Sequence, residues 1–363
     1  MNALRIYAGA RALARVRERG LLPSDVRVIP AAAGGPKGLM LLAIDRFLFG
    51  EWLPQSKSSE PIDLIGASIG AWRMAAACLN DPVTALEKLE HDYIHQEYDI
   101  PPGKKGPTPE HVSEKFGAGI AATFGARETE VLQNPRYRLH IVTSRGRHLM
   151  RRDTKLRAGL GYAGAYFANV ASRKAMGAWI ERAVFSARAA PLPFATDDYR
   201  TRRYGLTVEN FASVVQASCS IPFVLRAVHD ILGAPRGAYW DGGITDYHLH
   251  LDYRLRCESS DGVVLYPHFQ QAVVPGWLDK SLKWRHRSTH FLDDAVVLAP
   301  NPEWVATLPS QKIPDRADFM RYGRDTATRV RVWKQAVAES VRLRDEFAEL
   351  LYAKRLSERI EPL

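Results

Sequence analysis

Apolar and polar positions divide the chain into two kinds of segment. Short apolar runs rich in β-branched residues predict buried strands, at residues 26–30, 62–67, 138–144, 238–240, 262–267 and 295–300. Longer segments with apolar residues every three or four positions predict helices, at residues 38–53, 69–79 and 207–218. Thr207 is a suitable N-cap for the last helix, with Asn210 three residues on. Strands that alternate with helices in this way are typical of an α/β fold with a mostly parallel central sheet.

Both ends of the chain also have helical patterns. The first twenty residues contain five Arg and one Glu but no contiguous apolar run, so we expect an amphipathic helix there and not a secretory signal. After Pro314, apolar residues recur at helical spacing, at Val330, Trp333, Val337, Val341 and Leu351. We therefore expect residues 1–310 to form one domain and residues 311–363 a helical extension packed on the same domain.

Two internal segments interrupt the pattern. The Pro/Gly-rich residues 101–109 predict a loop and form the best internal linker, and residues 150–182 look inserted. In the second segment, aromatic and basic side chains are mixed: Tyr162, Tyr166, Phe167 and Trp179 lie among Arg151, Arg152, Lys155, Arg157, Arg173 and Lys174. Such a mixture suits a contact with a membrane surface, and it equally suits a basic helix packed on the domain by its aromatic side.

Composition excludes several classes of protein. With 46% hydrophobic and 25% charged residues, the 363-residue chain is expected to fold and not to be disordered. No run approaches the roughly 18 apolar residues that a membrane-spanning helix needs. The three cysteines, Cys78, Cys219 and Cys257, are widely separated and form no C-x-x-C pair. This spacing excludes a disulfide scaffold and favours a cytoplasmic location.

The positive charge of the chain is concentrated in one region. The net charge is +10, and residues 136–203 contain fifteen basic and four acidic residues, or +11, so the remainder is close to neutral. A positive region on a near-neutral body favours an anionic partner, which can be a lipid surface, a nucleic acid or an acidic small molecule. Composition alone does not choose among these.

Residues Gly66-Ala67-Ser68-Ile69-Gly70 form a G-x-S-x-G sequence between a predicted strand and a predicted helix. In this context a sharp turn holds the serine in strained backbone geometry and exposes its hydroxyl, while Gly66 and Gly70 avoid Cβ clashes. The amides at the start of the following helix can stabilise an oxyanion. Ser68 is therefore a candidate nucleophile at a nucleophile elbow.

A glycine-rich turn, residues 33–38 with the sequence Ala-Gly-Gly-Pro-Lys-Gly, lies between the preceding strand and helix. Its amides can form an oxyanion hole, with Gly34, Gly35, Lys37 and Gly38 as candidate residues; the alternative is a flexible turn. It is not a phosphate-binding P-loop, because Leu39 stands where that motif needs Ser or Thr. Since Pro36 has no N–H, the donors must come from Gly34, Gly35 or their neighbours.

The sequence Asp241-Gly242-Gly243 follows the short predicted strand at residues 238–240. Taken alone, such a sequence is usually a turn. Near a nucleophilic serine, however, a carboxylate at the end of a neighbouring strand can accept the serine proton if burial raises its pKa. Asp241 is therefore the candidate base for Ser68.

The three motifs together resemble those of the patatin-like phospholipase family, a group of lipid acyl hydrolases. The family pattern is a glycine-rich oxyanion loop ending in a basic residue and glycine, then G-x-S-x-G, then Asp-Gly-Gly or Asp-Gly-Ala, and all occur here in that order. Residues 217–222 are similar to the family's A-S-x-x-x-P stretch, and the resemblance covers roughly residues 26–247. Ala33 replaces the usual first loop glycine. Asp246-Tyr247-His248 stands where Asn and Pro are more usual. We expect this difference to affect the shape of the substrate site more than the reaction itself.

The resemblance implies a patatin-like three-layer α/β fold and catalysis by a dyad of Ser68 and Asp241, with the loop at Gly34 to Gly38 as oxyanion hole. It implies hydrolysis of lipid acyl esters through an acyl-enzyme, in the manner of a phospholipase A or lysophospholipase, with no metal or organic cofactor. The expected partners are a phospholipid or other acyl-ester lipid and, peripherally, an anionic membrane surface. Nucleic acid is disfavoured, because no recognised nucleic-acid fold motif accompanies the basic residues.

Three other interpretations stay open. His248, His250 and His268 follow Asp241, so residue order also permits an α/β-hydrolase triad, although that would leave the glycine loop and Asp-Gly-Gly unexplained. His91 and His95 are spaced like a zinc pair, but no third ligand is evident and a solvated helix face is the simpler explanation. A non-catalytic module that binds anionic lipid or nucleic acid is the third, and the reactivity of Ser68 distinguishes it from an enzyme.

Overall fold

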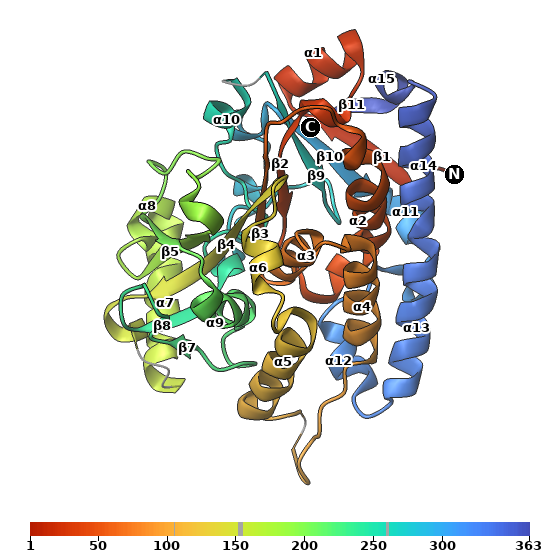
Figure 1. The fold of residues 1–363 in the computed structure, drawn as a ribbon. Coiled ribbons are helices and arrows are strands. Elements are labelled where there is room, and N and C mark those ends of the chain that lie inside the picture. Colours follow the sequence, from red (N-terminus) through yellow and green to blue (C-terminus); the bar gives the residue numbers. More distant parts are fainter. Residues whose placement is uncertain (105, 152–154, 259–260) are drawn as a thin grey trace.

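A mixed, mostly parallel sheet lies at the centre of the molecule, with helices on both sides (Figure 1). The computed structural model describes residues 1–104, 106–151, 155–258 and 261–363, and of residues 155–158 it describes the backbone alone. The strands are β1 Leu4–Ala8, β2 Val26–Ala31, β3 Ile62–Ala67, β4 Tyr137–Gly146, β5 Ile180–Ser186, β6 Thr201–Gly205, β7 Val228–His229, β8 Ala238–Asp241, β9 Val263–Pro267, β10 Ala295–Pro300 and β11 Ile360–Pro362.

Helices connect and cover these strands. They are α1 Ala10–Arg19, α2 Leu42–Phe47, α3 Ile69–Ala77, α4 Pro82–His95, α5 Pro109–Phe124, α6 Glu128–Leu132, α7 Lys155–Ala171, α8 Arg173–Met176, α9 Val208–Cys219, α10 Arg254–Glu258, α11 Pro302–Val305, α12 Ala317–Tyr322, α13 Thr326–Glu339, α14 Val341–Tyr352 and α15 Leu356–Arg359. In the described part of the chain, none of them combines the length and the apolarity that a membrane crossing needs.

The strand order is β11-β1-β10-β9-β2-β3-β4-β5-β6, and β8, itself paired with β7, adds to the edge of β4. Six of the ten pairings between described strands are parallel, and they include all those from β10 through β9, β2 and β3 to β4. The predicted α/β class and mostly parallel sheet are therefore confirmed. Crossover helices are what allow neighbouring strands to run in the same direction.

The two faces of the sheet are covered differently. Successive strand residues point to opposite faces, so Leu64 and Ile141 belong to one buried cluster while Ile65 and Val142 belong to the other. Side chains of α2, α3, α4, α9, α13 and α14 complete the first cluster. The second is closed largely by irregular chain around Leu249, Leu251 and Val273. Both faces are buried, which explains why the central strands read as continuous apolar runs.

All six predicted strands are present, as β2, β3, β4, β8, β9 and β10, and the sheet also contains strands that the apolar pattern does not predict. Residues Leu4–Ala8 form β1, which pairs with β10, so the amphipathic helix expected over the first twenty residues is confined to α1. β5 begins at Ile180, so the last residues of the supposed insertion 150–182 belong to the sheet. β5 contains the buried charges Glu181 and Arg182, and β6 is mostly polar and partly exposed, so a hydrophobicity pattern predicts neither strand.

The predicted helices at residues 69–79 and 207–218 are confirmed as α3 and α9. The second begins with the expected cap: the Thr207 N–H donates to the Asn210 side chain. The helix predicted over residues 38–53 is instead a 3₁₀ segment, Gly35–Leu41, then α2, then a π turn, Leu48–Trp52. A 3₁₀ turn at Leu53–Gln55 follows, and its Pro54 cannot donate an N–H, so regular α-helical bonding cannot continue through this end.

The C-terminal region is mostly helical, and α13 and α14 run along one side of the molecule (Figure 1). The helical pattern from Val330 to Leu351 divides into two helices at Ser340, whose hydroxyl donates to the Val337 carbonyl. The chain then ends in β11, which pairs in parallel with β1. The C-terminal segment therefore contributes a strand to the sheet as well as helices on its surface.

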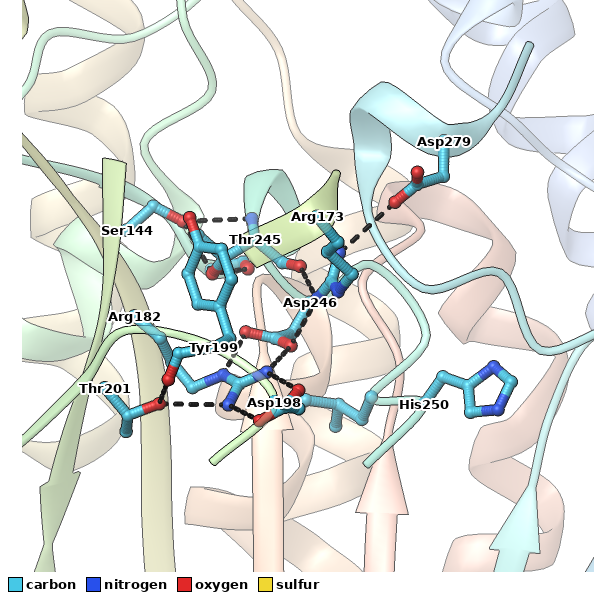
Figure 2. A network of polar contacts seen from close by, with 12 residues as sticks. Ser144, Arg173, Arg182, Asp198, Tyr199, Thr201, Thr245, Asp246, His250 and Asp279 are labelled. Atoms are coloured by element: carbon cyan, nitrogen blue, oxygen red, sulfur yellow. Dashed lines mark hydrogen bonds and ion pairs between the residues drawn. The ribbon is translucent and has the colours of Figure 1, made fainter. Parts of the chain in front are cut away.

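A buried network of ion pairs ties α8 and the end of the inserted segment to the chain that follows β8 (Figure 2). Asp246 accepts hydrogen bonds from the Arg182 guanidinium at 2.7 Å and from Arg173 at 3.0 Å. Arg182 also contacts Asp198, and Arg173 also contacts Asp279. Asp246 and Arg182 are completely buried. Although burial opposes ionisation, the neighbouring guanidinium of Arg182 keeps the pKa of Asp246 below its usual value.

The network separates the residues of the stretch Asp246-Tyr247-His248, which the sequence predicts to affect substrate shape. The Asp246 carboxylate points into the protein and accepts from Arg173 and Arg182, whereas Tyr247 lines a small pocket together with Asp241. Ion pairs with carboxylates also offset part of the excess positive charge of residues 136–203. Arg138, Arg145, Arg147, Arg173, Arg182 and Arg200 all contact carboxylates, at Asp63, Glu181, Asp198, Asp246 or Asp279.

Replacing Asp246 with Asn should strongly destabilise the fold. Removal of one partner of a buried ion pair leaves an uncompensated charge, so the free energy of unfolding should fall by about 3–5 kcal/mol. Asp92→Asn is a matched control, because its pair with Lys88 is exposed and worth less than about 1 kcal/mol. Urea unfolding of the two variants makes the comparison. Equal, small losses would show that the network contributes little.

Candidate active site

Strand β4 brings the ends of β3 and β8 together on one of its edges. Residues 143–145 of β4 pair with β5 on one side, so β8, which pairs with the same residues, must lie on the side of β3. β3 pairs with β4 up to Ala67 opposite Val142, and Asp241 of β8 lies opposite the next residue, Thr143. Ser68, which follows Ala67, therefore meets Asp241 across a separation of 173 residues.

Ser68 lies at a sharp turn from β3 into α3. Its backbone has φ 56° and ψ −130°, a conformation that non-glycine residues rarely adopt. Close packing explains the flanking glycines: a Cβ on Gly70 would lie 1.9 Å from the Ala31 carbonyl oxygen, and one on Gly66 would lie 2.4 Å from the backbone of Ala71. The turn is therefore held against β2 at a distance that only glycine allows.

The Ser68 hydroxyl donates a hydrogen bond of 2.6 Å to Oδ2 of Asp241. The other carboxylate oxygen, Oδ1, accepts from the Gly243 N–H at 2.7 Å. Both residues are buried. Burial raises the pKa of the Asp241 carboxyl above its usual value, against the opposing effects of the Arg316 charge and of the bonds from Ser68 and Gly243. The carboxylate thus lies in hydrogen-bond contact with the hydroxyl whose proton it would accept.

The glycine-rich turn lies at the end of β2, beside the elbow. Gly35 has φ +57°, a left-handed conformation that favours glycine, and it lines the same cavity as Ser68. Gly34 precedes the 3₁₀ segment, whose first N–H groups have no partner within it. Gly38 lies one turn further on, against Ile69 of α3, and the Lys37 ammonium lies 4.9 Å from the centre of the Phe269 ring. Of the four candidate oxyanion residues, Gly35 is the one that lines the cavity with Ser68, and Gly34 directly precedes it.

Residues 217–222 hold the serine and the aspartate in register. The Ser218 hydroxyl accepts from the Ser68 N–H at 3.0 Å and donates to the Val142 carbonyl of β4 at 2.7 Å. The Ser220 carbonyl accepts from the Asp241 N–H at 2.9 Å. This segment therefore fixes the backbone of both residues. The resemblance to the patatin-like pattern singled out residues 217–222 in the sequence. Their small polar side chains did not predict these hydrogen bonds.

A cavity of about 350 Å³ opens at Ser68. Its walls are mainly apolar and come from α4 and the following loop, α5, the turn at 221–225 and α12: Tyr93, Tyr98, Ile100, Val112, Phe116, Ile221, Phe223, Leu225, Phe319 and Met320. The predicted linker at residues 101–109 contributes Gly106 and Pro107 to this wall. The cavity therefore offers an apolar space directly beside the serine hydroxyl.

The three histidines that follow Asp241 in sequence bond elsewhere. His248 Nδ1 accepts from the Val274 N–H, His250 bonds to the Val273 carbonyl and Thr289, and His268 bonds to the Gln270 backbone. Burial lowers their pKa values, that of His250 to about 4 and that of His268 to about 3. In the described part of the chain, none of the hydrogen bonds of these histidines reaches Ser68 or Asp241, so the triad that residue order permits is not assembled there.

Other residues marked in the sequence lie away from this centre. His91 and His95 stack on each other on the exposed side of α4, and the described residues include no group of three or more His, Cys, Asp or Glu side chains suited to a metal ion. Cys78, Cys219 and Cys257 are free and buried.

The aromatic and basic residues of 151–180 have several roles. Tyr162 and Trp179 pack against a buried cluster, Tyr166 bonds to Ser281, and Phe167 is 71% exposed. Arg173 belongs to the buried network, while Arg151 and Lys174 are exposed. Arg152 lies outside the described residues, as do the side chains of Lys155 and Arg157. Much of the segment thus packs on the domain by its aromatic side.

A protein-family model for patatin-like phospholipases matches residues 32–248, more than half of the chain. The chain belongs to the patatin-like phospholipase family. The matched region contains the glycine-rich turn, the elbow and Asp241, and membership supports lipid acyl hydrolysis in general terms. A search of curated proteins found no match. The family match ends before residues 249–363, which in this patatin-like chain supply further residues beside Ser68, above all Arg316.

Proposed function

We propose that this chain hydrolyses lipid acyl esters with Ser68 as nucleophile and Asp241 as its base. The observation that carries the proposal is the 2.6 Å hydrogen bond from the Ser68 hydroxyl to the Asp241 carboxylate, at the mouth of an apolar cavity. Family membership supports the general reaction, and the strained backbone at Ser68 supports the role of the nucleophile.

The first step forms an acyl-enzyme. As the Ser68 oxygen attacks the acyl carbonyl carbon, its proton passes to Asp241, and the carbonyl oxygen becomes an oxyanion. Backbone N–H groups of Gly34 and Gly35, and that of Ile69 at the start of α3, are candidates to stabilise it. Collapse of this intermediate breaks the ester bond, and the departing alcohol takes the proton from Asp241.

The second step releases the acid. Water gives its proton to Asp241 as it attacks the acyl-enzyme carbonyl, the same amides stabilise the second oxyanion, and the Ser68 oxygen leaves with the proton held by Asp241. The enzyme returns to its starting state and the products are a fatty acid and an alcohol. The described site needs no further group for the proton balance of either step.

The apolar cavity suits the acyl chain of the substrate. Side chains such as Tyr98, Phe116 and Phe319 offer apolar surface next to Ser68, and each buried methylene contributes about 0.8 kcal/mol to binding. We infer that the acyl chain occupies this space while its carbonyl faces the glycine-rich turn.

Exposed apolar residues border the same cavity. Phe223, Val224 and Met320 line it, yet they are 58%, 47% and 69% exposed. Apolar side chains left open to water around a lipid-sized cavity favour contact with a lipid surface. We infer that the chain touches membranes peripherally through this rim, which would let a lipid pass from the surface to Ser68.

The Ser68 hydroxyl should be the group that a fluorophosphonate serine probe labels. Ser68→Ala should remove both labelling and ester turnover, and Asp241→Asn should reduce turnover by at least a thousandfold, because the amide cannot accept the proton. His248→Gln, His250→Gln and His268→Gln are controls expected to stay within about tenfold of wild type. Labelling that survives Ser68→Ala would refute the assignment, and a folded histidine variant without activity would favour a triad.

The pH dependence of turnover should follow the ionisation of Asp241. Only the carboxylate accepts the proton, so kcat/KM should fall as the pH drops through the pKa of Asp241. Because burial raises that pKa, the fall should occur at a higher pH than the value of about 3.9 of an unperturbed aspartate. Turnover of a soluble ester measured across the acid range checks this. A fall centred near or below that value would contradict the assignment.

The apolar rim should determine membrane binding. A double variant, Phe223→Ser with Met320→Ser, should weaken co-sedimentation with phospholipid vesicles about tenfold or more, since each side chain loses up to about 1.5–3 kcal/mol of transfer free energy. Leu232→Ser is a matched control, because Leu232 is 64% exposed but does not line the cavity. Equal binding by wild type and the double variant would exclude the rim as the contact.

A further inference from the structure

Two arginines line the cavity that opens at Ser68, and their guanidinium groups have different surroundings. Arg329 is 3% exposed and donates to the carbonyls of Ile94 and Gln96, so its hydrogen bonds hold the fold. Arg316 is partly exposed. Within the described chain its guanidinium has no hydrogen bond, and no carboxylate lies within 4.0 Å of it. Of the two, Arg316 is therefore the cation that a substrate in the cavity can reach.

Arg316 lies beside the glycine-rich turn and borders the pockets of both proposed catalytic residues. It lines the large cavity together with Ser68 and Gly35, and the small adjoining pocket together with Asp241. A Cβ on Gly35 would lie 3.2 Å from the Arg316 Nε and 3.4 Å from its Cγ, so the side chain packs directly against the turn. The guanidinium is thus placed where the glycine-rich turn and the serine face the same space.

The basic residue of the glycine-rich turn itself has a different position. Lys37 is not among the residues that line either pocket, and its ammonium lies 4.9 Å from the centre of the Phe269 ring. Arg316 lies outside residues 32–248, the region that the family model matches. The cation that shares the cavity with Ser68 on this side is therefore contributed by a segment that the family match does not include.

A hydrogen-bonded turn holds Arg316 at the start of α12. The buried carboxylate of Asp318 accepts from the Asp315 N–H at 3.1 Å and from the Trp333 indole N–H at 3.0 Å. The Lys312 ammonium lies 2.7 Å from the other oxygen of Asp318, Oδ1. The backbone around Arg316 is thus fixed before a substrate binds. A donor that is held in place in advance stabilises a developing charge without having to reorient.

We propose that the Arg316 guanidinium is part of the oxyanion hole, where it donates to the ester carbonyl oxygen as that oxygen becomes negative. The inference rests on the proposed function and deepens it by adding a charged side chain to the backbone amides of Gly34, Gly35 and Ile69. When the Ser68 oxygen bonds to the carbonyl carbon, the electron pair of the C=O π bond moves to the oxygen. Arg316 stays protonated throughout and transfers no proton. Because a hydrogen bond between a cation and an anion is stronger than one to a neutral carbonyl, this donor favours the transition state over the bound ester.

The first test uses p-nitrophenyl butyrate, an uncharged soluble ester, so that membrane binding and charged substrate groups play no part. Arg316→Gln should lower kcat/KM about a hundredfold, through kcat more than KM, since one oxyanion donor contributes roughly a hundredfold to a thousandfold to kcat. Arg316→Lys should lose less, because it keeps the charge but not the planar fork. Arg321→Gln is the matched control: Arg321 is an exposed cation of α12 that does not line the cavity, and its variant should equal the wild type.

The pH profile separates this role from an effect on Asp241. The positive charge of Arg316 lowers the pKa of Asp241, so the acid limb of kcat/KM should move to higher pH in Arg316→Gln. Loss of an oxyanion donor should also lower the plateau above that limb, where Asp241 is fully ionised. A plateau equal to that of the wild type would refute the proposal, because Arg316 would then act only through Asp241.

An analogue of the oxyanion provides a test that does not depend on turnover. The carbonyl of octyl trifluoromethyl ketone can take up the Ser68 oxygen and then carries a negative oxygen, whereas the corresponding alcohol cannot. Arg316→Gln should weaken inhibition by the ketone about a hundredfold and leave inhibition by the alcohol unchanged. Equal weakening of both compounds would show that Arg316 only shapes the cavity, and unchanged inhibition by the ketone would also overturn the proposal.

Ser68→Ala distinguishes a failure of this inference from a failure of the proposed function. If Ser68→Ala is inactive while Arg316→Gln keeps a normal plateau and normal ketone inhibition, only the inference fails. If Ser68→Ala keeps its turnover, the proposed function fails and the inference fails with it. Urea unfolding of Arg316→Gln and Arg321→Gln should give equal stabilities, since Arg316 is partly exposed and its guanidinium has no partner within the described chain. If Arg316→Gln proves unstable, Arg316→Lys takes its place in the same three measurements.

Discussion

The pairing of one strand with two others is the constraint on which the proposed site depends. β3 and β8 share an edge of β4, and their ends meet where Val142 and Thr143 follow one another. Ser68 and Asp241 come together only because each continues a strand that is hydrogen-bonded to this edge. Ser218 reinforces the junction, since its hydroxyl bonds both to Val142 and to the Ser68 N–H. A one-residue shift in the register of either strand against β4 would place other side chains at this junction in place of Ser68 and Asp241.

Two buried aspartates five residues apart show how the surroundings separate structural from chemical roles. Asp246 contacts the guanidinium groups of Arg182 and Arg173, which keep its pKa below the usual value. Among the described residues, the direct bonds to the Asp241 carboxylate come from the neutral donors Ser68 and Gly243, and burial raises its pKa. The first carboxylate is fixed as an anion that joins parts of the fold. The raised pKa of the second carboxyl suits the proposed role of base.

The structure changes the interpretation of the positive charge along the sequence, because it shows which cationic side chains have acidic partners. Residues 136–203 carry the excess positive charge, but several of their arginines contact carboxylates from this segment or from elsewhere. Arg316, which lines the cavity with Ser68, comes instead from the C-terminal third of the chain, and no carboxylate of the described residues lies within 4.0 Å of it. Counting charges along a segment cannot separate these cases, because the partner of a charge is set by folding and not by sequence distance.

By itself, the sequence determined the α/β class, the central strands and the sharp turn at Ser68, and it singled out Asp241 as the candidate base. These are local properties: apolar runs, glycines beside a turn, and motifs of a few residues. Only the tertiary structure decided that β1, β5 and β11 join the sheet, that Asp246 is a structural anion, and that Arg316 lies beside the proposed site. Each of these depends on contacts between residues far apart in the chain, and no local pattern records which distant side chain will meet a given strand end.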